Sequence, residues 1–257
     1  MGEAMIRGIL DRGVAKANEI VVSDISDKRR SHLGRQYGVT TTSDNRQAME
    51  KAESIVLAIK PASLTEVMRE LKGFLQPEQL VLSIVAGAPM ASLCSGLNHR
   101  AVVRAMPNMP AQIGEGVTVW TATNELKEEH LKKAHSLLAA LGREIFVSDE
   151  MYIDMATAVS GSGPAYVFLI IESLVDAGVH IGLPRELAQE LVHETILGAT
   201  RLSQKSGKHP AELRNLVTSP GGTTTEGLFQ LEERGLRSLL AQAIIAGYEK
   251  SKRLKQG

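Results

Sequence analysis

Short apolar runs rich in β-branched residues alternate with amphipathic segments along the first 148 residues. Such runs predict strands, and segments whose apolar residues recur every three to four positions predict helices. Strands are predicted at 19–23, 53–59, 80–85, 101–105, 116–121 and 144–147. Helices are predicted at 1–13, 26–37, 64–71, 90–97 and 127–141. This alternation is typical of a parallel sheet covered on both faces, so residues 1–148 are expected to form an α/β domain.

The pattern changes near residue 149, after which only helices are predicted. Residues 164–177 are apolar nearly all round, with six consecutive apolar side chains from Tyr166 to Ile171. A helix that is apolar on every face must be buried on every face. Further helices are predicted at 186–203 and 228–254. We therefore expect residues 149–257 to form an all-α domain that covers this helix with a second copy of the chain, as an obligate homodimer.

Composition and charge argue against several classes of protein. The 29 basic and 29 acidic residues give no net charge, which disfavours a nucleic-acid binder with a broad basic surface. The longest strictly apolar run, 165–171, is far shorter than the ~20 residues of a membrane span. Cys94 is the single cysteine, which excludes an intrachain disulfide and a multi-cysteine metal site. The sequence thus predicts a cytoplasmic protein with no metal, nucleic-acid or membrane partner.

The usual signatures of self-sufficient catalysis are missing from the sequence. It contains no HExxH, GxSxG, Walker or CxxC motif. An α/β domain without an acid–base or metal cluster is typical of chemistry performed by a bound cofactor, which the protein orients.

Two glycine-rich segments stand out in the helical half. The first is AVSGSGPAY at 158–166, and the second is TSPGGTTTEG at 218–227. In the second, a Pro-Gly-Gly turn exposes backbone N–H groups just before a predicted helix, an arrangement that suits a small carboxylate. Each segment alone is also explained by a turn followed by a helix cap. Two of them behind a nucleotide-binding type of domain favour a ligand site.

Several motifs resemble those of one enzyme family. SGSGPAY, GLPRELA, HPAELRNLVTSPGGTT and GLRSLLAQAI resemble the C-terminal domain of pyrroline-5-carboxylate reductases, and LAIKP and RAMPNMPAQIGEGVT resemble their N-terminal domain. The resemblance implies a Rossmann-like dinucleotide-binding domain followed by an all-α dimerisation domain. It also implies reduction of 1-pyrroline-5-carboxylate to L-proline, the last step of proline biosynthesis, with NADPH or possibly NADH. Members of the family form homodimers, and many assemble further into decamers.

The resemblance also implies roles for individual residues. The substrate carboxylate is expected at Ser219, Gly221 and Gly222, with Thr223 beside them. The hydroxyl of Thr224, the expected catalytic group, lies against the ring nitrogen.

On the cofactor side, the expected residues follow predicted strands, where open α/β sheets bind their ligands. Lys60 and Pro61 follow one strand, and Asn108 follows another and is expected beside the nicotinamide. The chain departs from the family at its start, where members have a strand and a G-x-G-x-x-G turn. Gly2 matches the third glycine, while the strand, which would be central in the sheet, and the first two glycines have no counterpart. We expect a start codon assigned at an internal methionine, and weaker cofactor binding than in a chain extended upstream.

The choice between NADP and NAD stays open in the sequence. Asp24 lies 22 residues after Gly2, near where such folds contact the adenosine ribose, and an acidic residue there favours NAD. Ser23, with the basic run 28–30 nearby, could instead accommodate the 2′-phosphate of NADP.

Two alternative functions are compatible with parts of the sequence. A reductase of the β-hydroxyacid dehydrogenase type would carry a lysine on the helix after a glycine-rich turn, and residues 164–177 contain none. A non-catalytic truncated paralogue that still dimerises is the second alternative, and NADPH binding would distinguish it.

Overall fold

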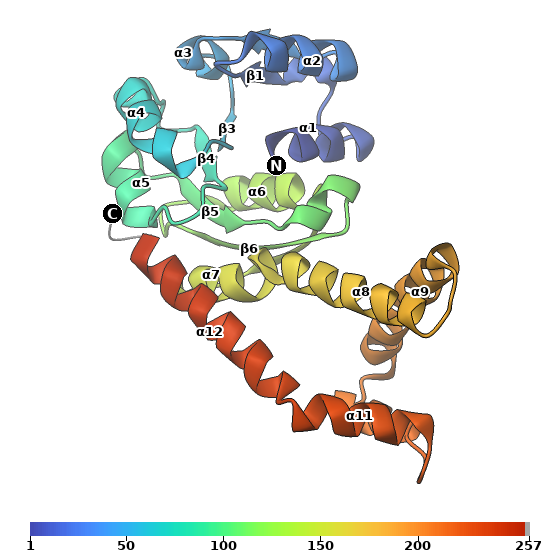
Figure 1. Ribbon diagram of the computed structural model, residues 1–257. Helices are drawn as coiled ribbons and strands as arrows, with labels where there is room; N and C mark the ends of the chain where they lie inside the picture. Colours follow the sequence, from blue (N-terminus) through green and yellow to red (C-terminus); the bar gives the residue numbers. More distant parts are fainter. Residues whose placement is uncertain (255–257) are drawn as a thin grey trace. The chain divides into compact units, whose positions relative to one another are not determined.

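The computed structural model describes residues 1–254 and divides the chain into two compact units (Figure 1). The first unit comprises residues 1–164 together with the chain from Gly247 onward, and the second comprises residues 165–246. The predicted domain boundary after residue 148 lies just beyond the last strand, whereas the first compact unit continues to Pro164. The last three positions of the predicted helical domain lie outside the described residues.

A five-stranded sheet forms the centre of the first unit. Its strands, in spatial order, are β3 (Ser54–Leu57), β4 (Leu80–Ser83), β5 (Val102–Met106), β6 (Gly116–Ala122) and β7 (Gly142–Phe146). β3, β4 and β5 are parallel, but β5 and β6 are antiparallel, so the prediction of a wholly parallel sheet is wrong. The connection at 107–115 holds only the short 3-10 helix Met109–Ile113, and a parallel crossover needs a dozen or more residues.

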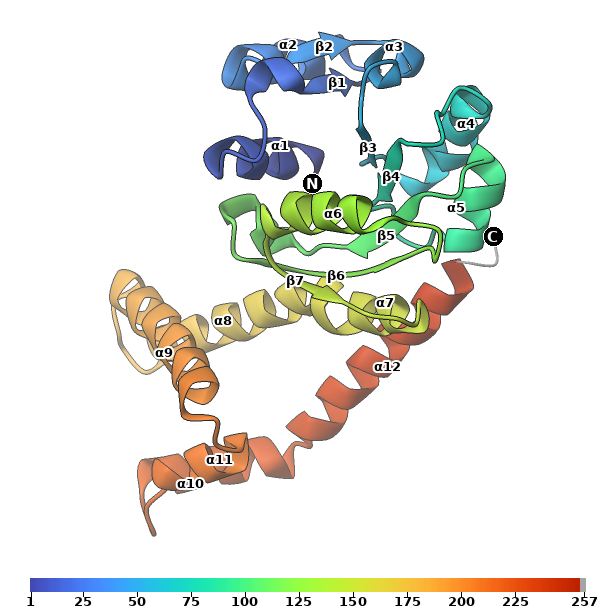
Figure 2. The same ribbon diagram turned by 180° about the vertical axis from the view of Figure 1, so that it is seen from behind.

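A separate two-stranded sheet is formed by β1 (Val21–Ser23) and β2 (Thr40–Thr42), as Figure 2 shows. β1 pairs with β2 and β3 pairs with β4, but no backbone ladder joins β1 to β3 anywhere in residues 1–254. β2 and the short helix α3 (Asn45–Met49) were not predicted, because the three threonines of β2 form no apolar run and α3 has only 5 residues.

Helices cover both faces of the larger sheet. α1 (Gly2–Asp11) and α6 (Glu128–Ala139) pack on one face, where Leu80 and Leu82 of β4 point. α4 (Pro61–Leu71) and α5 (Met90–Leu97) pack on the other face, where Val81 points. β4 is thus buried on both faces. A strand in this position needs apolar side chains on both faces, which explains why its first three residues are all apolar. α2 (Asp27–Tyr37) packs with α1 and β1 in a smaller core.

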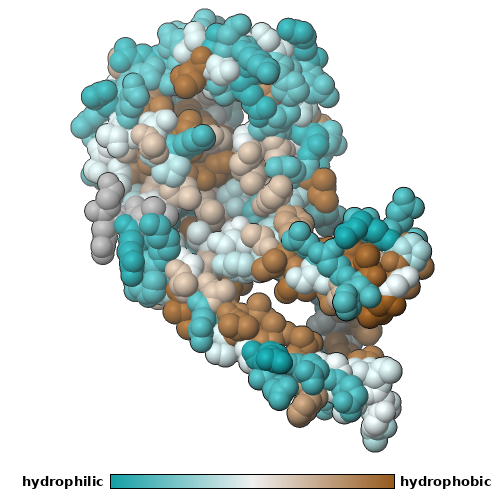
Figure 3. Space-filling model, viewed as in Figure 1, coloured by the Kyte–Doolittle hydropathy of each residue, from teal (hydrophilic) through white to brown (hydrophobic). Residues whose placement is uncertain are grey.

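The chain after β7 is helical, as predicted. It forms α7 (Met151–Ala156), a π-helical turn (Thr157–Gly161), α8 (Gly163–His180), α9 (Arg185–Ser206), α10 (Pro210–Leu216), α11 (Thr223–Glu233) and α12 (Leu236–Leu254). The helix predicted at 164–177 corresponds to α8, and within one chain it is not buried on all sides as expected. Val175 is the one buried residue of α8, a helix that lies wholly within the described part. Apolar side chains therefore remain exposed on this unit, as Figure 3 shows.

Residues 151–180 form one continuous helical stretch. Among the described residues, this stretch alone is long and apolar enough to cross a membrane. The core helix of a globular protein passes the same test of length and composition, so the observation is weak evidence for a membrane span.

Candidate functional site

The cofactor residues predicted from the sequence gather around the carboxyl ends of the parallel strands. Lys60 is the N-cap of α4 and Pro61 its first residue, directly after β3, and both are exposed. Gly2 begins α1 beside the same strand, since a Cβ atom added there would lie 3.3 Å from the Cβ atom of Ala58. The start of α1, with its unpaired N–H groups, therefore lies next to the end of β3.

Ser23 and Asp24 lie at the end of β1, as expected. The Asp24 carboxylate accepts a hydrogen bond from the Ser26 amide at 2.8 Å, and its backbone carbonyl accepts one from the Arg30 guanidinium at 2.7 Å. Arg29 forms an ion pair with Glu3 at 2.6 Å. Lys28 has no ion pair within residues 1–254, so it is the free cation of the basic run.

Glu3, which the sequence analysis missed, ties the start of α1 to α2. Its carboxylate interacts with the His32 ring nitrogen and the Tyr37 hydroxyl, each at 3.0 Å, in addition to Arg29. These interactions, led by the hydrogen bond with His32, lower the pKa of Glu3 to about 2. This cluster holds the residue after Gly2 close to the helix that follows Asp24.

Asn108 lies just beyond β5, at the expected edge of the sheet, but its amide group is already engaged. The side-chain oxygen accepts a hydrogen bond from the Val117 amide at 2.9 Å, and the side-chain nitrogen donates one to the Ser160 carbonyl at 3.1 Å. Asn108 is 9% exposed. A contact with the nicotinamide stays a prediction, and the contacts present join two segments of the protein.

The expected substrate residues form the loop between α10 and α11 in the second unit. Gly221 has a φ of 68°, a backbone conformation that favours glycine. Gly222, the N-cap of α11, donates its amide to the Ser219 carbonyl at 3.1 Å. A Cβ atom at Gly222 would lie 2.5 Å from the Ser219 hydroxyl oxygen, so a larger residue there would force the Ser219 side chain to move.

The three threonines after this turn differ in their contacts. The Thr225 hydroxyl donates to the Ser219 carbonyl at 2.7 Å and closes the loop. The Thr224 side chain is half-buried, and its hydroxyl has no hydrogen-bond partner among the described residues, whereas Thr223 is exposed. Thr223 and Thr224 begin α11, so their amides have no partner within the helix. The Thr224 hydroxyl and these amides are therefore available to a ligand.

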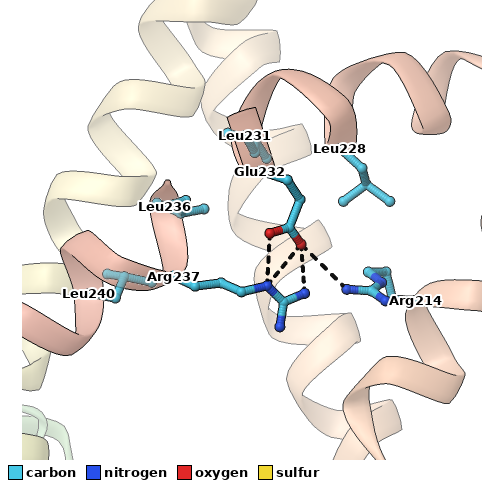
Figure 4. A pocket seen from close by; sticks show the side chains of 7 residues that line it. All are labelled: Arg214, Leu228, Leu231, Glu232, Leu236, Arg237 and Leu240. Carbon is cyan, nitrogen blue, oxygen red and sulfur yellow. Dashed lines mark hydrogen bonds and ion pairs between the residues drawn. The ribbon is translucent and has the colours of Figure 1, made fainter. Parts of the chain in front are cut away.

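A charged corner holds the helices that flank the loop (Figure 4). Glu232 of α11 accepts hydrogen bonds from Arg237 of α12 at 2.6–2.9 Å and lies 3.7 Å from a guanidinium nitrogen of Arg214 of α10. The Arg237 hydrogen bonds lower the pKa of Glu232. The sequence analysis missed this corner because Glu232 and Arg237 belong to different helices, separated by a turn at Gly235. A pocket of about 170 Å³ lies beside it, lined mainly by leucines.

Comparison with known proteins bears on the whole chain. Residues 150–254 match the family described as pyrroline-5-carboxylate reductase dimerisation, and residues 1–87 match the family described as NADP oxidoreductase coenzyme F420-dependent. The pyrroline-5-carboxylate reductase of Synechocystis is 39% identical over 254 residues, which cover 99% of this chain and 94% of that one. The enzyme of Pseudomonas aeruginosa is 38% identical, over 100% and 94% of the two chains.

The chain belongs to the pyrroline-5-carboxylate reductase family. Solved structures of the family agree. The Coxiella burnetii reductase superimposes with a TM-score of 0.89 at 36% identity, covering 98% of this chain and 94% of that one. The Plasmodium falciparum enzyme, solved with NADP bound, gives a TM-score of 0.91 at 32% identity, over 99% and 94% of the two chains. The predicted fold class, a Rossmann-like dinucleotide-binding domain followed by an all-helical dimerisation domain, is confirmed.

Family membership decides against the β-hydroxyacid dehydrogenase alternative. The pyrroline-5-carboxylate reductase relatives match both halves of the chain, including the helical half that would have distinguished the two types. The roles of the individual site residues in this member of the family stay predictions.

Proposed function

We propose that this chain reduces 1-pyrroline-5-carboxylate to L-proline with NADPH, or NADH in its place, as the last step of proline biosynthesis. The proposal rests on the family match along the whole chain. It is supported by the Thr224 hydroxyl and by the Thr223 and Thr224 amides at the start of α11, which have no hydrogen-bond partner among the described residues and can bind a ligand. The bound cofactor supplies the hydride.

The cofactor half of the site has the features that a dinucleotide needs. The first amides of α1 have no hydrogen-bond partner within the helix, and such N–H groups suit a pyrophosphate. A side chain at Gly2 would crowd Ala58, and Lys60 is an exposed cation at the same edge. Lys28, which has no ion pair within the described chain, supports contact with a 2′-phosphate and therefore supports NADPH.

At the substrate loop, the contacts refine the expected roles. The Gly222 amide is used within the turn, so the substrate carboxylate is bound by the amides of Thr223 and Thr224 and by the Ser219 hydroxyl. Gly221 and Gly222 contribute by permitting the turn. A carboxylate at a helix N-terminus is stabilised by these amides and by the helix dipole.

The Thr224 hydroxyl holds the ring nitrogen of the substrate. A protonated cyclic imine is already a good hydride acceptor, so the reaction requires alignment more than a strong acid or a metal. As the carbon of the imine is reduced, the ring nitrogen becomes a basic amine. A hydroxyl that keeps its hydrogen bond through this change stabilises the transition state more than the bound substrate.

Replacing Thr224 by alanine tests the proposal. Losing one hydrogen bond to a charged group costs about 1.5–3 kcal/mol, which corresponds to roughly a 10- to 150-fold fall in kcat. The dissociation constant of NADPH should barely change, as measured by fluorescence titration. Thr223→Ala is the matched control. A larger loss in the control, or a Thr224→Ala enzyme within twofold of the parent, would refute the assignment, and a parent that binds no NADPH would favour the non-catalytic paralogue.

The assembly and surroundings of the enzyme complete the proposal. We propose a homodimer formed through the helical domain, with a decamer as a higher assembly, in the cytoplasm and without nucleic-acid or membrane partners. Exposed apolar side chains on α8 and α9 and the dimerisation family matched by residues 150–254 support the dimer. Contact with a second copy would also account for the apolar stretch at 151–180 without a membrane.

A further inference from the structure

A buried arginine joins the central sheet to the helix that follows it. Arg104 of β5 is 2% exposed, and its guanidinium contacts the Glu150 carboxylate at 2.5 Å and the Asp154 carboxylate at 2.8 Å. The same Glu150 oxygen accepts the amide of Met90, the first residue of α5, at 2.8 Å. One guanidinium thus fixes α7 against β5 and, through Glu150, against α5. Removing it would take one ion pair from each of the two carboxylates, and the Asp154 side chain is only 3% exposed.

Two more side chains of β5 and its extension, Met106 and Asn108, also contact the segment that follows α7. A Cβ atom at Gly161 would lie 3.3 Å from the methyl group of Met106, and Asn108 reaches the Ser160 carbonyl at 3.1 Å. Arg104, Met106 and Asn108 are alternate residues, so the contacts follow one face of the strand and its extension. Together they reach both α7 and the π-helical turn after it.

The contact of Asn108 with Ser160 has a specific physical cause. In a helix, the carbonyl of residue 160 would accept a hydrogen bond from the amide of residue 164. That residue is Pro164, which has no N–H group. The turn is widened here, and the Ser162 amide bonds to the Thr157 carbonyl at 2.9 Å, five residues back. The Asn108 side chain supplies the donor that the proline cannot.

The position of this turn connects it to the reaction. β3, β4 and β5 are parallel, so their carboxyl ends lie at one edge of the sheet, and Asn108 lies just beyond that edge. We infer that Arg104 and Asn108 are positioning residues, which hold α7 and the π-helical turn so that the backbone at 160–163 lies at a fixed place beside the cofactor site. This inference rests on the proposed function. Asn108 then acts on hydride transfer through the turn, without touching the cofactor.

The variant Asn108→Asp separates the two roles. Its carboxylate can still accept the Val117 amide but cannot donate to the Ser160 carbonyl. Hydrogen exchange of the Ser162 amide, followed by mass spectrometry or NMR, should accelerate about ten-fold, as expected for the loss of one hydrogen bond. We expect kcat to fall by a similar factor while the dissociation constant of NADPH stays within twofold.

Asn45→Asp is the matched control within the same unit. Asn45 of α3 donates its side-chain amide to the Glu70 carboxylate at 2.8 Å, so the same substitution also removes one hydrogen bond. It should leave both Ser162 exchange and kcat unchanged. In a second test, Arg104→Lys keeps the charge but loses the planar fork that reaches two carboxylates at once. It should accelerate exchange of the α7 amides and lower kcat more than it raises KM.

Two results would overturn the inference. Unchanged Ser162 exchange in Asn108→Asp would show that the turn does not depend on this bond. A rise in the dissociation constant of NADPH that parallels the loss of kcat would show that Asn108 contacts the cofactor. A parent without reductase activity contradicts the proposed function and removes the catalytic part of the inference, while the exchange comparison still decides whether Asn108 holds the turn.

Discussion

The two units of this chain differ in how far each completes its own core. All four residues of β4 are buried in the first unit, from both faces of the sheet. In the second unit, Phe168 and Leu169 of α8 are 52% and 62% exposed, although both are large and apolar. The first unit can therefore be stabilised by contacts within one chain. The second depends on a surface that another chain must provide.

Helical glycines of the two units differ in how much space surrounds them. In the first unit, a Cβ atom at Gly8 of α1 would lie 2.3 Å from the backbone oxygen of Ala140. In the second unit, Gly198 of α9 and Gly227 of α11 have no atom within 4 Å of such a position. The second unit is tight where α8 meets α9, since a Cβ atom at Gly178 would lie 3.2 Å from the Cβ atom of Ala188, but it has space beside Gly198 and Gly227.

The largest effect is expected from a charge placed on the exposed apolar face. Leu169 is an exposed apolar residue of α8 that we expect in the dimer interface, and losing such a side chain in Leu169→Asp costs about 2 kcal/mol per copy. A symmetric dimer loses two such side chains, so it should dissociate roughly a thousand-fold more readily. Sedimentation velocity across a range of protein concentrations measures this shift.

Ile25→Asp is the control for the same chemical change. Ile25 is 97% exposed in the first unit, so it is more accessible than Leu169, but it does not belong to the helical surface. Its replacement should leave the oligomeric state unchanged. A dimer that tolerates Leu169→Asp but dissociates with Ile25→Asp would show that the interface lies on the first unit and not on the helical unit.

A smaller effect is expected from filling the close contact in the first unit. Gly8→Ala should lower the free energy of unfolding by about 3 kcal/mol, because backbone cannot move aside as a flexible side chain can. Urea denaturation measures the loss. Gly34→Ala in α2 is the control, since its Cβ atom would make ordinary contacts at 3.7 Å or more and should be neutral or stabilising by up to about 1 kcal/mol. Equal midpoints for the two variants would contradict the packing described.

Periodicity predicted the elements better than their connections. α5 occupies the predicted range, because its helix signal and its ending at Asn98 are both local. The direction of β6 was predicted wrongly, because it depends on the length of one connection rather than on the strand itself. The turn at 219–222 was predicted from its proline and glycines. The bond between Asn108 and Ser160 was not, because it joins residues 52 positions apart and arises from an N–H group that Pro164 lacks.

The smallest effect concerns acid stability within the first unit. The pKa of Glu3 falls from an ordinary value of 4.5 to about 2 on folding, so its ionised form is favoured in the folded state. Its stabilisation is fully present above pH 4.5 and is lost as the pH falls through about 2. Glu3→Gln should therefore lower the urea midpoint at pH 7, and the gap to the parent should close towards pH 2.

Glu66→Gln serves as the control for this pH dependence, because Glu66 is exposed and has no ion pair within the described chain. Its midpoint should follow that of the parent at every pH. The Glu3 effect should also be independent of protein concentration, unlike that of Leu169→Asp. A concentration-dependent Glu3 effect would mean that the first unit, too, relies on a second chain.

The connectivity of the units has a mechanical consequence. The chain leaves the first unit at Pro164 and returns to it at Gly247, so both ends of the described chain belong to the same unit. A force applied at residues 1 and 254 therefore acts on the first unit. Residues 165–246 form a loop between two segments of that unit and bear no tension while it stays folded. The helical unit would carry tension only after the returning segment of α12 has been pulled away. In a stretching experiment on one chain, rupture of the first unit should precede extension of the second.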